Sequence, residues 1–140
     1  PPGGTRSNGP IRAGAYGSSG NYQATANDEI LVIPMIETKT AIENIEAILD
    51  VPGIDGVFVG PFDLSGSMGK PGKIDDPEVQ AAIGAIVEAA RKRDIALCAY
   101  AHTPAHALTY RKLGYRVIGL CTDYIMLARA AASYLKEAKA

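Results

Sequence analysis

The sequence predicts an α/β fold built from four successive strand–helix repeats around a parallel sheet. Four short apolar runs alternate with amphipathic stretches, and each run has the length of a strand. The runs are continuously apolar, which is typical of parallel strands covered on both faces. Four βα units with right-handed crossovers give either a small doubly wound sheet or part of an eight-fold barrel. A complete barrel needs about 250 residues, so 140 residues hold only half of one.

Length, composition and charge exclude several classes of protein. The chain fits one ordinary domain, and no apolar run approaches the roughly 20 residues of a membrane helix. Its 14 Lys and Arg residues against 15 Asp and Glu residues leave a net charge of −1, so no whole-chain field attracts nucleic acid or an anionic bilayer. Cys98 and Cys121 lie inside apolar runs, which suits buried thiols in a reducing compartment. We expect a cytoplasmic protein without nucleic-acid or membrane partners.

The first part of the chain is expected to be a loop segment followed by the first repeat. Residues 1–29 hold six glycines and three prolines, a composition typical of loop, and residues 30–140 carry the βα repeats. The four strands are expected at Ile30–Ile36, Gly56–Val59, Ile95–Tyr100 and Arg116–Cys121. After the first strand, Thr40 and Glu43 form a capping-box pattern. The first of four helices is therefore expected from there to about Asp50.

The later helices are marked by their first and last residues. Their starts are expected at Asp76–Pro77, Thr103–Pro104 and Thr122–Asp123. Proline is favoured at the first helical position after a capping side chain. Gly114 ends the third helix, because glycine is favoured just past a helix terminus. The last helix carries an apolar stripe that includes Tyr124, Leu127 and Tyr134 and is expected to pack on the barrel or on a partner subunit.

Two carboxylates stand at the ends of neighbouring strands. Glu37 follows the first strand, and Asp63 follows the second in the stretch Gly60–Asp63. Functional groups gather at the carboxyl ends of parallel strands in both candidate architectures. Two hard oxygen ligands on one rim suit Mg²⁺ or Mn²⁺, which leave other positions for water and substrate oxygens. Neither His nor Cys joins the pair, which argues against zinc.

Other readings of this rim stay open. Glu37 and Asp63 also fit a capping role, because acids are favoured at the positive ends of the following helices. The glycine-rich stretch Leu64–Gly69 after Asp63 is expected to be a loop whose backbone N–H groups can approach an anion. No lysine projects from a strand end, so a Schiff-base mechanism is not expected.

The residues around the two acids resemble those of a known enzyme superfamily. Ile33–Thr38 and Val51–Ser65 closely resemble the 4-hydroxy-2-oxoheptanedioate aldolase and citrate lyase β-subunit superfamily. Pro1–Arg6 and Leu120–Tyr124 look similar too, so the resemblance covers essentially the whole chain. It implies the carboxyl-terminal half of a TIM barrel, with about four parallel strands and four helices.

The resemblance also implies the chemistry. Glu37 and Asp63 would hold a divalent metal (Mg²⁺ or Mn²⁺, with Co²⁺ as a further option) that chelates a 2-oxo acid such as pyruvate. The metal would stabilise the enolate formed when a carbon–carbon bond to an aldehyde breaks or forms, as in a class II aldolase. The backbone at Phe62 and Asp63 would receive the substrate carboxylate. Met35 stands where better-known aldolases carry glutamine, so a polar contact near the substrate is lost. Phe62 stands where many carry alanine, so the side of the substrate pocket is bulkier.

The same family places a histidine and an arginine upstream of the segment that opens this chain. We therefore hypothesise that the chain is the carboxyl half of a longer enzyme and is inactive alone. Half a barrel leaves two strand edges unpaired, so association is expected; the resemblance implies a homo-oligomer, a trimer or hexamer.

Three further side chains are weaker candidates. His102 ends the third strand and is a possible replacement for a general base, although the family does not use this position. Its alternative is a loop histidine that caps or faces water. Arg6 and Arg12 can pair with a substrate carboxylate, but they more readily bind carbonyls or neighbouring subunits.

Two other functions compete with the aldolase. An acyl-CoA lyase of the citrate lyase type shares the two acids but needs a cofactor groove that the sequence does not locate. A non-catalytic half-barrel that serves as an assembly or binding module needs no metal at all.

Overall fold

The computed structural model describes residues 12–18 and 20–139, in two compact units, Pro1–Leu31 and Val32–Ala140. In the first unit a short 3₁₀ segment, η1, spans Arg12–Gly17, and helix α1 spans Tyr22–Glu29. The loop expected over residues 1–29 is therefore wrong for the α1 stretch. The reason is local, because the eight residues of α1 contain neither glycine nor proline.

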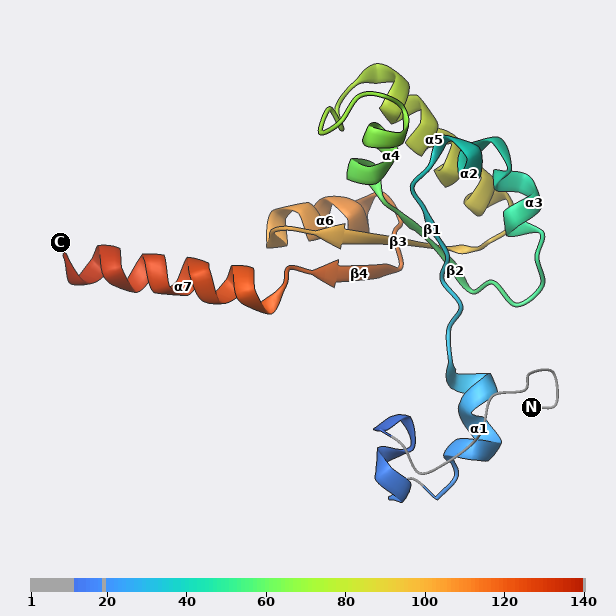
Figure 1. Cartoon of the computed structure of the whole chain (residues 1–140), viewed down its shortest axis with the longest axis horizontal. Helices are drawn as coiled ribbons and strands as arrows, with labels where there is room; N and C mark the ends of the chain where they lie inside the picture. Colours follow the sequence, from blue (N-terminus) through green and yellow to red (C-terminus); the bar gives the residue numbers. More distant parts are fainter. Residues whose placement is uncertain (1–11, 19, 140) are drawn as a thin grey trace. The chain divides into compact units, whose positions relative to one another are not determined.

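The second unit contains a four-stranded parallel sheet (Figure 1). Its strands are β1 (Met35–Ile36), β2 (Gly56–Val59), β3 (Ala96–Ala101) and β4 (Val117–Leu120). They lie in the order β1-β2-β3-β4, so each strand pairs with its neighbour along the chain. A doubly wound sheet reverses its strand order at a switch point. The uninterrupted order therefore favours the barrel alternative.

Strand β1 is shorter than the expected run Ile30–Ile36. Val32 accepts a hydrogen bond from the Asp55 N–H at 3.0 Å, and its own N–H donates to the Asp55 side chain at 2.8 Å. The chain therefore already runs beside β2 at Val32. Pro34 has no N–H to donate, which interrupts the ladder between Val32 and β1.

Six helices follow the strands of the second unit. They are α2 (Lys39–Glu43), α3 (Ile45–Leu49), α4 (Pro61–Ser67), α5 (Pro77–Lys92), α6 (Pro104–Lys112) and α7 (Asp123–Ala138). With α1, the described residues form seven α-helices rather than the four expected. The starts of α5, α6 and α7 agree with the expected caps, and Gly114 adopts a φ of +86° past α6.

Two differences explain the extra helices in this unit. The helix expected from Thr40 to Asp50 is broken at Asn44, whose side-chain amide donates to the Thr40 carbonyl at 2.8 Å and competes with the helical ladder. Its cap is Thr38 rather than Thr40, since the Thr38 hydroxyl accepts from the Ala41 N–H. The stretch expected as a glycine-rich loop contains α4, which begins at Pro61.

The core lies on one face of the sheet. Alternate strand residues are buried in a core that they share with residues of α3 and α5. Helix α5 packs on β2 and β3, and α6 packs beside β3 and β4 (Figure 1). These buried strand residues are Ile36, Val57, Val59, Leu97 and Ala99. Because side chains alternate, the residues between them face the other side of the sheet. Met35 on that side is 51% exposed. One face of the sheet is thus closed by helices. The other is exposed at Met35, although Cys98 on it is buried.

Among the described helices, none is both long and apolar enough to cross a membrane.

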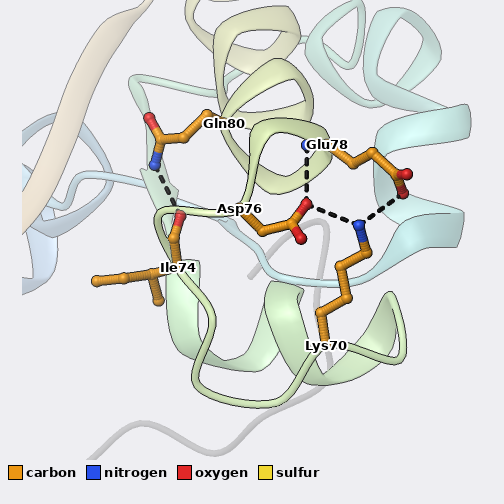
Figure 2. Close-up of polar contacts among 5 residues, drawn as sticks. All are labelled: Lys70, Ile74, Asp76, Glu78 and Gln80. Carbon is orange, nitrogen blue, oxygen red and sulfur yellow. Dashed lines mark hydrogen bonds and ion pairs between the residues drawn. The ribbon is translucent and has the colours of Figure 1, made fainter.

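The connection from α4 to α5 is closed by an ion cluster (Figure 2). The Lys70 ammonium lies 2.7 Å from the Asp76 carboxylate and 3.0 Å from that of Glu78. Asp76 also caps α5 by accepting from the Glu78 N–H at 3.0 Å. The hydrogen bond to Asp76, and then that to Glu78, raises the pKa of Lys70 above 10.5. The hydrogen bond from Lys70 lowers the pKa of Asp76 below 3.8.

This cluster predicts a defined pH dependence of stability. Because folding lowers the pKa of Asp76, the Asp76 carboxylate contributes to the free energy of unfolding above pH 3.8. This contribution is lost as the pH falls through the pKa of the folded state. Because folding raises the pKa of Lys70, the Lys70 ammonium contributes to the free energy of unfolding below pH 10.5. This contribution is lost as the pH rises through the pKa of the folded state. The free energies of unfolding of the wild type and of Asp76→Asn, measured in urea, should differ most between these two pH limits. The difference should shrink below the lower limit and above the upper one. A difference that does not change with pH would contradict this assignment.

Candidate functional site

Glu37 lies at the end of β1, opposite the end of β2. The pairing of Met35 with Phe58 and of Ile36 with Val59 brings Glu37 level with Gly60, and the Gly60 N–H donates to the Ile36 carbonyl at 3.1 Å. A Cβ atom placed on Gly60 would lie 2.8 Å from the Cβ of Glu37 and 3.0 Å from its Oε2. The Glu37 side chain therefore packs directly over the backbone of Gly60, in space that a larger residue at position 60 would need.

Asp63 lies in the first turn of α4, which starts directly after β2. Gly60 is the N-cap residue, and Pro61 takes the first helical position. Leu64 makes the first backbone hydrogen bond of the helix, to the Gly60 carbonyl at 3.0 Å. The N–H groups of Phe62 and Asp63 precede that bond and are therefore among the unpaired donors of a helix start. The expected backbone donors near an anion are thus supplied by a helix terminus, not by a loop.

The two acids suit a hard cation by their chemistry. Within the described part of the chain, neither the Glu37 nor the Asp63 side chain has a hydrogen-bond or ion-pair partner. No group of three or more His, Cys, Asp or Glu side chains in the described residues is placed to hold a metal. A cation here would therefore have two protein carboxylates and would take its other ligands from water and substrate, as Mg²⁺ commonly does.

A cavity of about 550 Å³ opens at the carboxyl ends of β1, β2 and β3. Four of the residues singled out in the sequence line it: Met35, Phe62, Asp63 and His102. Glu37 does not line it, because its side chain lies against Gly60, which does. The structure thus brings Met35, Phe62, Asp63 and His102 together around one cavity and places Glu37 at its edge.

His102 forms part of the wall of this cavity. Its ring meets the ring of Tyr100 edge-on, with centroids 4.7 Å apart, and that of Phe62 at 6.2 Å. The His102 carbonyl accepts from Arg129 of α7 at 2.9 Å. These contacts give His102 an aromatic packing role, and a part in proton transfer stays a prediction.

Sequence reasoning missed several lining residues, among them Tyr100 and Arg129. Tyr100 could have been found, because it lies two residues before His102 and so shares its face of the strand. Arg129 lies within α7 and had no signal, since only the tertiary structure brings it to His102. Of the two candidate arginines, Arg6 lies outside the described residues, and Arg12 belongs to η1 in the first unit.

The two cysteines are free thiols rather than a disulfide. Cys98 is fully buried on β3, and burial raises the pKa of its thiol. Such a thiol is a poor nucleophile and a poor metal ligand at neutral pH. This agrees with a structural role.

The close packing of Glu37 on Gly60 predicts the effect of a methyl group at that position. Gly60→Ala should lower the free energy of unfolding by about 1–3 kcal/mol, because the added Cβ overlaps the Cβ of Glu37. Gly66→Ala in α4 is the matched control. No atom lies within 4 Å of its added Cβ, so it should be neutral or stabilising by about 0.5–1 kcal/mol. Equal unfolding free energies for the two variants in urea would show that Glu37 does not occupy this space.

Comparisons with known proteins identify the family to which the chain belongs. The family model described as HpcH/HpaI aldolase/citrate lyase matches residues 1–130. The chain is 39% identical to a hydroxypyruvate/pyruvate aldolase of Paraburkholderia phytofirmans, covering 94% of this chain and 50% of that protein. It is 45% identical to a 4-hydroxy-2-oxo-heptane-1,7-dioate aldolase of Salmonella heidelberg, covering 94% of this chain and 51% of that protein. The chain spans about half the length of these relatives.

A solved structure gives the same result at the level of the fold. The crystal structure of an HpcH/HpaI aldolase/citrate lyase family protein from Burkholderia cenocepacia superposes with a TM-score of 0.85 at 35% identity. The match covers 100% of this chain and 55% of that one. The expected α/β fold, with four parallel strands of a TIM-barrel type, is thereby confirmed. The chain belongs to the HpcH/HpaI aldolase/citrate lyase family.

Proposed function

We propose that this chain supplies the metal-binding half of a class II aldolase. The enzyme would cleave or form a carbon–carbon bond between pyruvate, or a related 2-oxo acid, and an aldehyde. The relatives named as aldolases support a carbon–carbon lyase acting on small molecules. The metal, the 2-oxo acid and the residue roles are our proposals for this chain.

One observation carries the proposal. Two carboxylates that have no partner among the described residues follow the ends of adjacent parallel strands. Asp63 lines the cavity there, and Glu37 packs on Gly60, which also lines it. Glu37 is half-buried and Asp63 is exposed, so both carboxylates are accessible to a cation from solvent. A structural cap would instead show a bond to the helix N–H groups, and none is formed by Glu37 or Asp63 among the described hydrogen bonds. The donor set therefore favours a cation over capping.

The chain's own residues would bind and orient the substrate. The N–H groups of Phe62 and Asp63 are suited to donate hydrogen bonds to the substrate carboxylate, because they are unpaired donors at a helix start. Met35 and the Phe62 ring would form an apolar wall and exclude water on one side. When bound, a divalent cation (Mg²⁺, Mn²⁺ or Co²⁺) supplies Lewis-acid stabilisation of the negative charge that develops on the oxo group.

We propose further that catalysis needs residues beyond this chain. The chain matches about half of each relative's length. The proton-transfer histidine and the arginine implied by the resemblance have no counterpart assigned within it. A cytoplasmic location likewise stays a prediction, resting on the two free cysteines.

A homo-oligomer is part of the same proposal. Strand β4 lies at one edge of the four-stranded sheet, with Val117 39% and Leu120 45% exposed. Helix α7 has no buried residue and carries Tyr124, Leu127 and Tyr134 on one side, each about 70% exposed (69%, 72% and 72%). Apolar surface of this kind is typical of a face that another chain covers.

Metal binding tests the proposed function. The chain should bind Mn²⁺ in isothermal titration calorimetry, and oxalate, a planar analogue of the 2-oxo acid, should tighten binding. Glu37→Gln and Asp63→Asn should each raise the Kd at least about tenfold, because tenfold corresponds to about 1.4 kcal/mol and a charged ligand is worth more. Glu43→Gln and Asp75→Asn remove the same charges from exposed positions and should leave the Kd unchanged.

Two outcomes would replace this function by another. Protection of the chain from unfolding by coenzyme A, without an effect of oxalate, would favour an acyl-CoA lyase. Absence of any Mn²⁺ binding would favour a non-catalytic assembly module.

Association is tested by analytical ultracentrifugation. The chain should sediment as a species larger than one copy, because its apolar β4 edge and α7 stripe remain exposed in the single chain. Leu127→Glu with Tyr134→Glu should shift the distribution toward the monomer. Lys136→Glu, on the opposite side of α7, changes the charge equally and should have no effect. A monomer at every concentration would refute the oligomer.

A further inference from the structure

A single side-chain hydrogen bond joins the two segments that carry Glu37 and Asp63. The hydroxyl of Ser67 accepts from the backbone N–H of Lys39 at 2.9 Å. Lys39 opens α2, two residues after Glu37, and Ser67 ends α4, four residues after Asp63. Among the described residues, no other side-chain hydrogen bond or ion pair links α4 to the turn between β1 and α2.

Helix geometry connects this bond to Asp63. Residues four apart lie on the same face of a helix, so Asp63 and Ser67 share one face of α4. Holding Ser67 to the N–H of Lys39 therefore limits how α4 can rotate about its axis relative to the segment that carries Glu37. The short length of α4, seven residues, makes such a restraint more important, because a helix of two turns has little stability of its own.

The other anchors of α4 act elsewhere. The buried hydroxyl of Ser65 donates to the Phe62 carbonyl at 2.6 Å and accepts from the Gly72 N–H at 3.1 Å. Leu64 is fully buried in the core. These contacts fix α4 to its own following loop and to the core. Strand pairing places the start of α4 beside Glu37. Ser67 adds the side-chain contact that holds the last residue of α4 to the β1–α2 turn.

The start of α2 shows that the Ser67 bond is more than a cap. The α2 N-cap, Thr38, already satisfies the Ala41 N–H through its own hydroxyl at 3.1 Å. Both Thr38 and Ser67 thus accept from the first turn of α2, but only Ser67 comes from another element. Comparing the two hydroxyls separates the stability of α2 from the connection between α2 and α4.

We propose that Ser67 is a positioning residue of the metal site, setting the distance between the Glu37 and Asp63 carboxylates without touching the cation. The inference rests on the proposed function, in which these two acids are the ligands. Groups that hydrogen-bond directly to metal ligands typically contribute at least tenfold to metal affinity. Ser67 would act one step further out, through the backbone between Lys39 and Glu37.

The test measures Mn²⁺ affinity by calorimetry and folding stability by urea unfolding, on the same variants of the full chain. Ser67→Ala should raise the Kd for Mn²⁺ about tenfold. Ser67→Thr, which keeps the hydroxyl, should bind within about twofold of the wild type. Ser67→Val has the shape of threonine without the hydroxyl and should behave like Ser67→Ala, which keeps the test valid if the alanine variant folds poorly.

Thr38→Ala is the matched control. It removes a hydroxyl that accepts from the same helical turn, so it should lower stability by a similar amount and leave the Kd nearly unchanged. The inference is overturned if Thr38→Ala weakens Mn²⁺ binding as much as Ser67→Ala, since the effect would then come from the stability of α2. It is also overturned if Ser67→Ala binds like the wild type while Glu37→Gln and Asp63→Asn do not. In that case the proposed function stands, whereas a wild type that binds no Mn²⁺ overturns both.

Discussion

The candidate site depends on the absence of a side chain at Gly60. The register of β1 and β2 places Glu37 opposite this residue, and the Glu37 Cβ lies where a side chain at position 60 would begin. Gly60 is also the N-cap of α4, whose first turn carries Asp63. One residue without a side chain therefore lets the first acid pack closely and starts the helix that presents the second. Strand pairing fixes this arrangement before any ligand is present, which is the preorganisation that a binding site needs.

The sheet has two unlike faces, and the difference explains where the cavity lies. Helices α3 and α5 cover the face that holds Val57, Val59 and Leu97, so the core is complete on that side. The opposite face carries the exposed Met35 and the aromatic lining of the cavity. In a closed barrel the inward face is filled by side chains from all eight strands. A sheet of four strands supplies only part of these side chains, which agrees with a chain that matches about half of each relative.

The sequence was sufficient for the sheet and for the residues at its rim, because continuous apolar runs and strand-end acids are local signals. It was insufficient for α4, which contains two serines and a glycine among seven residues and has low intrinsic helix propensity. Burial of Leu64 and the hydrogen bonds of Ser65 hold this helix, and neither is visible in a local pattern. The break at Asn44 was missed for a related reason. Its amide competes for a backbone carbonyl, while the apolar spacing around it still reads as one helix.

The two acids are held by different kinds of force, and they should respond differently to solution conditions. Glu37 is placed by strand register and by van der Waals contact with Gly60, neither of which involves charge. Asp63 depends on α4, whose Ser65 carbonyl accepts from the Lys70 N–H at 2.7 Å. The Lys70 ammonium in turn pairs with Asp76 across the same loop. Protonating Asp76 therefore loosens the support of α4 while the Glu37 segment keeps its place. Because the hydrogen bond from Lys70 lowers the pKa of Asp76, this support of α4 persists to a pH below the usual range of a carboxyl group.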